Sequence, residues 1–424
     1  MSEASDEDTT LLRFSTAGSV DDGKSTLIGR LLYETKQIYE DQLASVERAS
    51  QQQGAEYLNL ALLTDGLRAE REQGITIDVA YRYFATPTRK FIIADTPGHL
   101  QYTRNMVTGT STADAAVVLV DARNGVVEQS RRHAFIASLL RVPHLIVCVN
   151  KMDLVNYDQA VFERIRDEFQ AFAAQLDDAS ITFIPLSALN GDNVVDPSSN
   201  MPWYRGPTLL RQLESVEVAS TVAEEPLRFP VQWVVRPYTS GHDYRAYAGQ
   251  VAAGVVHPGD AVRILPRGLK SRVRSVDTYD GPLAEAFPPL SVALRLEDDL
   301  DVSRGDMICG LEDQPAVTRD ITATLCWLNE QPMAVGSRCI LRHTTRGVRA
   351  RIEALEFRID VNSLEHDSSA STLALNDIGQ VRILASGPIF ADTYARSRAT
   401  GSFVLIDQAT DATVAAGLIV SART

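Results

Sequence analysis

The sequence predicts an α/β domain with a mostly parallel sheet and helices on both faces, followed by two β-barrel domains. In the first half of the chain, short apolar runs alternate with amphipathic stretches of helical length, as expected for parallel strands buried on both faces. In the second half, short alternating segments are separated by closely spaced turn signals, which is typical of barrels and sandwiches. The length of 424 residues exceeds one ordinary hydrophobic core and favours two or three domains.

Hydrophobic patterning defines the elements of the first half. Continuous apolar runs predict buried strands, and the stretches between them carry apolar residues at helical spacing. A further strand is expected at residues 75–83, beside a polar segment. The remaining predicted strands lie at residues 14–17, 91–94, 115–120 and 145–149, and the predicted helices at 25–39, 127–140 and 158–175.

The second half follows a polar stretch that has the composition of a linker. Turn signals such as His257-Pro258-Gly259-Asp260 and Arg304-Gly305-Asp306 then separate the short segments. A weaker break near residues 312–318 divides this half in two. The predicted organisation is an α/β domain at 1–218, a linker at 219–226, a β-barrel domain 2 at 227–314 and a β-barrel domain 3 at 315–424.

Composition limits the possible partners and the compartment. The formal net charge of −14 disfavours a large non-specific nucleic-acid surface, which needs many cations. None of the four cysteines forms a C-x-x-C pair, and Cys148 lies in an apolar run, so a buried reduced thiol is expected. The acidic N-terminus lacks the features of a signal peptide, and no apolar run is long enough to span a bilayer. These observations predict a cytoplasmic protein without a membrane partner.

A phosphate-binding loop is expected at residues 18–25, GSVDDGKS, between a predicted strand and a predicted helix. Its glycines let successive backbone N–H groups surround an anion at the positive end of a helix. We expect Lys24 to bridge the β- and γ-phosphates and Ser25 to ligate Mg²⁺. Asp21 is a candidate ligand for a monovalent cation, whereas Asp22 is expected to be a solvated loop carboxylate. The expected phosphate-side residues are Gly18, Ser19, Val20, Asp21, Asp22, Gly23, Lys24, Ser25 and Thr26.

A second motif, DTPGH at residues 95–99, follows a predicted strand. Asp95 is expected to hold Mg²⁺ through a water molecule. Gly98 is expected to offer its N–H to a γ-phosphate, and Pro97 lies between the two. His99 stands where a residue that orients the attacking water is needed. Upstream, Thr76 can give its hydroxyl to Mg²⁺ only while the γ-phosphate is present, although the same segment also fits the start of a strand. The predicted catalytic residues are His99, Thr76 and Gly98, and the predicted metal ligands are Ser25, Thr76 and Asp95.

A third motif, NKMD at residues 150–153, follows another buried strand and predicts recognition of guanine. A carboxylate at Asp153 can accept hydrogen bonds from both donors on the guanine edge, a donor pair that adenine lacks. The stem of Lys151 can lie along the base, and the loop at 187–189 can direct a backbone N–H toward the guanine oxygen. The predicted base-side residues are Asn150, Lys151, Asp153, Ser187, Ala188 and Leu189. GTP and Mg²⁺ are therefore the expected cofactors.

These motifs, in this order, resemble those of the translation-factor superclass of GTPases, which includes elongation factor Tu. Several further strings are similar to the GTPase subunit of bacterial sulfate adenylyltransferase. Leu100 departs from that family, which usually has an acidic residue at this position, and Ser397 replaces a common asparagine. The strings lie at residues 63–67, 70–84, 101–106, 201–204, 376–379 and 400–403.

The resemblance implies a GTPase that acts with a smaller ATP-binding subunit, in a heterodimer or a higher assembly. In that family, GTP hydrolysis drives ATP and sulfate to adenosine 5′-phosphosulfate and pyrophosphate, a nucleotidyltransferase reaction whose adenylyl-transfer site lies on the partner. The alternative is an elongation-factor-like GTPase that delivers aminoacyl-tRNA. The strings around Thr76 and Asn105 favour the first interpretation.

Overall fold

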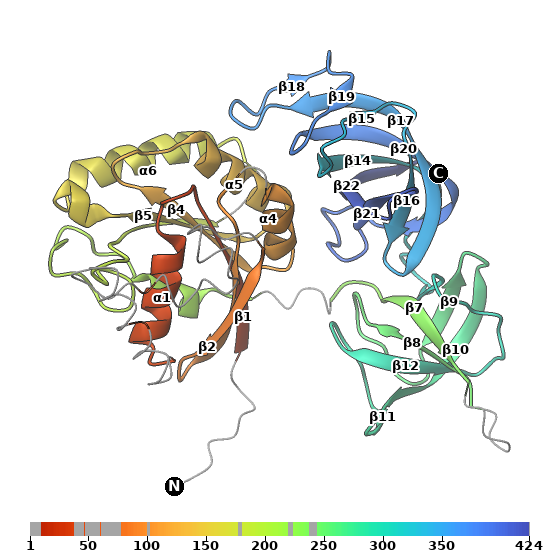
Figure 1. The fold of residues 1–424 in the computed structure, drawn as a ribbon. Helices are drawn as coiled ribbons and strands as arrows, with labels where there is room; N and C mark the ends of the chain where they lie inside the picture. Colours follow the sequence, from red (N-terminus) through yellow and green to blue (C-terminus); the bar gives the residue numbers. More distant parts are fainter. Residues whose placement is uncertain are drawn as a thin grey trace, which may run out of the picture. The chain divides into compact units, whose positions relative to one another are not determined.

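Two units make up the fold, which is a computed structural model (Figure 1). The first comprises residues 1–218 with 361–364, and the second residues 219–360 with 365–424. The structure describes residues 10–37, 46, 60, 78–99, 102–176, 180–218, 224–236 and 244–423. Among these, no helix has the length and apolar character needed to cross a membrane.

The first unit is built on a sheet with the strand order β2-β3-β1-β4-β5-β6. All neighbouring strands are parallel except β2, which pairs antiparallel with β3. The fold class predicted from the alternating apolar runs is confirmed. The strands are β1 (Thr10–Ala17), β2 (Ala80–Ala85), β3 (Arg89–Asp95), β4 (Ala115–Asp121), β5 (His144–Asn150) and β6 (Ser180–Pro185).

Helices cover both faces of this sheet because the central strands are apolar on both sides. Every residue of β4 is buried. On one face, Leu27, Ile28 and Leu31 of α1 join a core with Phe14 of β1 and other strand residues. The helices are α1 (Lys24–Glu34), α4 (Thr103–Thr110), α5 (Glu128–Leu139), α6 (Gln159–Ala173) and α7 (Leu209–Ser215), with a 3₁₀ helix η3 (Met152–Val155).

The boundaries of several elements differ from the sequence prediction, and β1 begins at Thr10, four residues before the strand predicted at 14–17. Helix α1 ends at Glu34 and does not continue through residues 35–37, because a turn follows in which Lys36 adopts a positive φ of 57°. Strand β2 begins at Ala80, and the earlier residues 75–77 of the strand predicted there lie outside the described residues.

The second unit contains two antiparallel sheets, each closed by an additional strand pairing. The first has the order β11-β10-β12-β8-β7-β13-β9, closed between β10 and β9; the second has the order β16-β21-β22-β14-β20-β17-β18, closed between β16 and β17. The predicted barrels are thus present, while the exact domain boundaries stay a prediction. The strands of the first sheet are β7 (Arg228–Val235), β8 (Ala246–Gln250), β9 (Ala261–Leu265), β10 (Leu269–Thr278), β11 (Gly281–Leu283), β12 (Ser291–Leu296) and β13 (Met307–Gly310). Those of the second are β14 (Ala316–Trp327), β16 (Arg338–His343), β17 (Arg346–Ile359), β18 (His366–Asp367), β20 (Ile378–Ala391), β21 (Ser402–Asp407) and β22 (Thr413–Arg423), beside a small pair β15 (Met333–Ala334) and β19 (Thr372–Leu373).

A buried ion pair joins the two barrels of the second unit. Arg228, at the start of β7, donates to both carboxylate oxygens of Asp392, which follows β20, at 2.8 and 3.0 Å. Their side chains are only 2% and 4% exposed, and the Thr400 hydroxyl also donates to Asp392 at 2.7 Å. Burial alone would raise the pKa of Asp392, but these donors hold it below its usual value. The pair therefore stays ionised in the interior.

We predict that Arg228→Ala lowers the unfolding free energy by about 3–5 kcal/mol, because it leaves an uncompensated buried carboxylate. Urea denaturation followed by circular dichroism measures the loss. The matched control is Arg267→Ala, which breaks the exposed pair with Asp301 in the same barrel and should change little. Equal unfolding midpoints for the two variants would show that the buried pair contributes nothing specific.

Candidate nucleotide-binding site

The predicted phosphate-binding loop connects β1 to α1, and its backbone is one that glycine permits. Gly23 immediately precedes α1 and adopts φ 93°. A Cβ atom at this position would lie 2.5 Å from Nδ2 of Asn150. The loop therefore packs directly against the end of β5, with the first turn of α1, including Ser25 and Thr26, beside it.

Lys24 is the buried cation of the loop, with only 8% of its surface exposed. Its ammonium donates to the carbonyl oxygens of Gly18 and Ser19, each at 2.8 Å. Burial lowers the pKa of Lys24, while the carboxylates of Asp95 and Asp22 act in the opposite direction. A buried ammonium held by neutral carbonyls is a strong attractor for a phosphate group, which would restore the solvation it has lost.

Asp22 is not the solvated carboxylate that the sequence suggested. It is 4% exposed, and its Oδ2 accepts the backbone N–H of Ser19 at 2.5 Å. Burial raises its pKa to about 6, and the nearby Lys24 opposes that rise. The prediction fails because the loop curls over its own side chain, so that Asp22 fixes the loop conformation. Asp21, in contrast, is exposed and has φ 68°.

The metal-side motif reaches the same loop from β3. Asp95 ends this strand, is 2% exposed and accepts a hydrogen bond from the Thr16 hydroxyl at 3.2 Å. A Cβ atom at Gly98 would lie 2.6 Å from Nζ of Lys24 and 2.8 Å from the carbonyl oxygen of Gly18. The segment that contains Pro97 and Gly98 thus lies against the loop, and only glycine fits at position 98.

The described residues supply only some of the oxygen ligands that Mg²⁺ requires. They contain no cluster of three or more histidine, cysteine, aspartate or glutamate side chains suited to a metal. Mg²⁺ in nucleotide sites commonly takes one or two protein oxygens and completes its shell with phosphates and water. The Ser25 hydroxyl and the Asp95 carboxylate, both beside the loop, fit that pattern. Thr76, the third predicted ligand, lies outside the described residues.

His99 follows Gly98 at the rim of the site and is half-buried. Its carbonyl accepts the backbone N–H of Tyr102 at 3.0 Å, and its ring meets the Tyr102 ring edge-on, with centroids 6.2 Å apart. These contacts hold the imidazole at the start of α4, next to the segment that approaches Lys24. Leu100, the departure from the family pattern, lies outside the described residues.

Asn150, at the end of β5, ties the phosphate side to the base side. Its Nδ2 donates to the carbonyl oxygen of Asp22 at 2.7 Å, and its Oδ1 accepts the backbone N–H of Ala188 at 2.9 Å. The side chain is 2% exposed. Both ends of the Asn150 amide are therefore hydrogen-bonded to the backbone of two loops, so Asp153 is the candidate for base recognition.

Asp153 carries an unused acceptor. Its Oδ1 is buried, and no hydrogen-bond donor reaches it within the described part of the chain. A buried carboxylate oxygen without a donor is costly, and the two N–H donors of a guanine edge would satisfy it. This observation fits the predicted role of Asp153 better than any structural role.

Lys151 is held beside the base position by a residue that the sequence did not single out. Its ammonium lies 3.0 Å from Oδ2 of Asp121, at the end of β4, and donates to the carbonyl oxygen of Asp21. Burial tends to raise the pKa of Asp121, but hydrogen bonds from Arg123 and Lys151 outweigh it and lower the pKa to about 2. The sequence could have identified Asp121 by its position, because it ends a buried strand, as the site residues Asp95 and Asn150 do.

The loop at 187–189 is fixed from α1. Nε of Arg30 donates to the Ala188 carbonyl at 3.1 Å, and the same guanidinium reaches the Leu189 carbonyl. The N–H groups of Ser187 and Ala188 already have acceptors. Of the three, only the N–H of Leu189 has no acceptor in the described residues, so it is the donor of this loop that can meet a guanine oxygen.

We predict that Asp153→Asn shifts nucleotide preference from GTP toward xanthosine triphosphate, because an amide can donate to the xanthine carbonyl where the carboxylate accepted from guanine. Competitive titration with labelled nucleotides measures the ratio of the two affinities. Asp158→Asn is the matched control, since Asp158 caps α6 on the surface and asparagine caps equally well. A variant that retained the wild-type preference would remove Asp153 from base recognition.

Comparison with known proteins agrees with this geometry. The family model described as the elongation factor Tu GTP binding domain matches residues 9–224, and the model described as the GTP-eEF1A C-terminal domain-like family matches residues 320–420. The bifunctional enzyme CysN/CysC of Mycobacterium tuberculosis is 59% identical over 421 residues, which cover 98% of this chain and 69% of that protein.

Two further relatives share the name sulfate adenylyltransferase subunit 1. Sulfate adenylyltransferase subunit 1 of Laribacter hongkongensis is 53% identical over 97% of this chain and 86% of its own length. The protein of the same name from Bacteroides fragilis is 52% identical over 98% of this chain and 87% of its own length. The chain, with its elongation factor Tu GTP binding domain, therefore belongs to the family of sulfate adenylyltransferase subunit 1.

Proposed function

We propose that this chain is the GTP-hydrolysing, energy-coupling subunit of a sulfate adenylyltransferase. Together with an ATP-binding partner it would drive ATP and sulfate to adenosine 5′-phosphosulfate and pyrophosphate. The family supports the nucleotidyltransferase assignment. The main support for GTP hydrolysis is that Lys24, Gly98 and Asp95 come together at the phosphate-binding loop. On the base side, the buried Oδ1 of Asp153 can accept a hydrogen bond from guanine.

The proposed roles follow from the positions of these groups. Lys24 binds the β- and γ-phosphates, and the N–H of Gly98 meets the γ-phosphate. Ser25, Asp95 and Thr76 are the proposed ligands of Mg²⁺, which neutralises phosphate charge when bound. We retain Asp21 as a proposed ligand of a monovalent cation. His99 orients the attacking water.

Coupling requires a partner because the product is a mixed phosphate–sulfate anhydride whose synthesis is uphill. GTP binding or hydrolysis can drive it only if the state of this chain changes the free energy of the partner's site. We place that partner's adenylyl-transfer site outside this chain. The four cysteines are all free and buried, which supports action in a reducing compartment such as the cytoplasm.

We predict that His99→Ala slows GTP hydrolysis by about 100-fold or more while GTP affinity stays nearly constant, because orienting water matters mainly in the transition state. Single-turnover hydrolysis in the assembled complex gives the rate, and equilibrium titration gives the affinity. The control His144→Ala changes a histidine at the opposite end of the sheet, where β5 begins. A wild-type hydrolysis rate in His99→Ala would refute the role.

We predict that the isolated chain forms no adenosine phosphosulfate, whereas the complex with an ATP-binding subunit exceeds the GTP-free equilibrium yield. Replacing GTP by a non-hydrolysable analogue should abolish the excess. Chromatography of labelled product from ATP measures the yield. Product formed by this chain alone would overturn the coupling model, and co-purification with tRNA in place of an ATP-binding subunit would favour the alternative of a delivery factor.

A further inference from the structure

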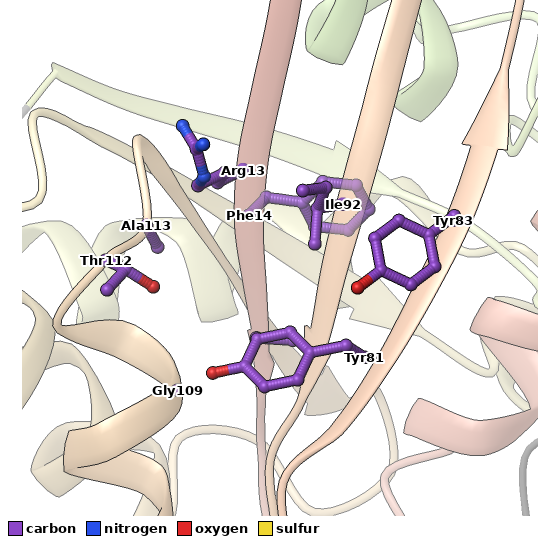
Figure 2. Close-up of a pocket in the computed structure, with 9 residues that line it drawn as sticks. Arg13, Phe14, Tyr81, Tyr83, Ile92, Gly109, Thr112 and Ala113 are labelled. Atoms are coloured by element: carbon purple, nitrogen blue, oxygen red, sulfur yellow. The ribbon is translucent and has the colours of Figure 1, made fainter. Parts of the chain in front are cut away.

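A cavity of about 190 Å³ lies on the sheet of the first unit, between β2, β3 and β1 on one side and the end of α4 on the other (Figure 2). Strand register places Arg13, Ile92 and Tyr83 side by side in one row, with Ala94 and Tyr81 in the next. Gly109, Thr112 and Ala113 close the side that faces α4. A cavity of about 150 Å³ accepts a benzene-sized group, so this one admits an aliphatic or aromatic side chain.

The lining combines exposed aromatic surface with a positive charge. Tyr81 and Tyr83 are 45% and 69% exposed, although both are large side chains. The Arg13 guanidinium, which is half-buried, has no ion pair or hydrogen bond to any described residue; the nearby Asp114 carboxylate accepts the backbone N–H of Arg13 at 2.8 Å. Tyrosine and arginine are the residues most enriched where protein interfaces gain their affinity.

The wall of the cavity touches the phosphate site. A Cβ atom at Gly109 would lie 2.7 Å from Cγ2 of Thr96, the residue that follows Asp95. The Thr96 hydroxyl donates to the carbonyl oxygen of Thr16 at 2.5 Å, and the Thr16 hydroxyl donates to Asp95. Helix α4 also begins four residues after His99. Gly109, in the wall of the cavity, therefore packs against the residue that follows Asp95.

We propose that this cavity docks the partner subunit, by receiving an apolar side chain of that subunit between the two tyrosines and a neighbouring carboxylate on Arg13. The inference rests on the proposed function, because it takes the ATP-binding subunit as the occupant. The charge of the lining indicates the chemistry of the occupant, because a half-buried guanidinium that forms no ion pair with a described residue favours an acidic group. Suppose that the shape of the cavity differs between the nucleotide states. By thermodynamic reciprocity, a partner that binds the cavity more tightly in one nucleotide state then also stabilises that nucleotide state.

The test measures the dissociation constant between the full-length chain and the ATP-binding subunit, with GDP and with a non-hydrolysable GTP analogue. Tyr83→Ala and Arg13→Glu should each weaken the complex by about tenfold or more, as expected for residues central to an interface. Tyr279→Ala is the matched control, since Tyr279 is fully exposed on the second unit. GTP affinity and melting temperature of the isolated variants should stay close to the wild-type values, which separates docking from misfolding.

Each outcome is decisive. Wild-type affinity in both cavity variants would overturn the assignment and leave the proposed function intact, whereas a wild-type chain that binds no ATP-binding subunit would overturn both. If Tyr83→Ala removed only self-association, seen by sedimentation, the occupant would be a second copy and the assignment would be wrong. A complex whose dissociation constant is the same with GDP and with the analogue would overturn the link between the cavity and the nucleotide.

Discussion

The nucleotide site depends on one buried amide. Asn150 donates to the loop that ends at Lys24 and accepts from the loop that contains Ala188, so phosphate and base elements are held at a fixed separation. Because both partners are backbone groups, the link does not depend on side-chain rotamers elsewhere. An aspartate at this position would lose the donor, and an apolar residue would leave two buried backbone groups unpaired.

Charge balance around this amide explains why the site suits an anion. Lys24 is buried and held by carbonyls, while Asp22 turns toward the backbone of its own loop and Asp121 is occupied by Arg123 and Lys151. Asp22 and Asp121 thus have donors of their own, which weakens their repulsion of an incoming phosphate. The positive charge of Lys24 and the N–H groups at the start of α1 remain oriented toward the loop before the ligand arrives.

The sequence predicted what local patterns determine. The predicted strands at 91–94, 115–120 and 145–149 lie within β3, β4 and β5, because such runs are apolar throughout. Each motif was found because it follows one of the predicted strands. Asp22 was misjudged, since its burial arises from the curl of the loop. Asp121 and Arg30 were missed because their partners are distant in the sequence, and such contacts leave no periodic signal. The positions of Thr76 and of the domain boundaries stay predictions.

Gly109 shows how the same fold can connect binding with hydrolysis. Its lack of a side chain lets α4 approach Thr96 closely, and Thr96 is hydrogen-bonded to the strand that leads into the phosphate loop. Closely packed interiors deform little, so a change of position at Thr96 would have to be accommodated at Gly109. Gly109 also lines the cavity that contains Tyr81 and Tyr83. Under the docking proposed above, this surface would respond to the state of the nucleotide without touching it, which is the physical requirement for coupling hydrolysis to a reaction on another subunit.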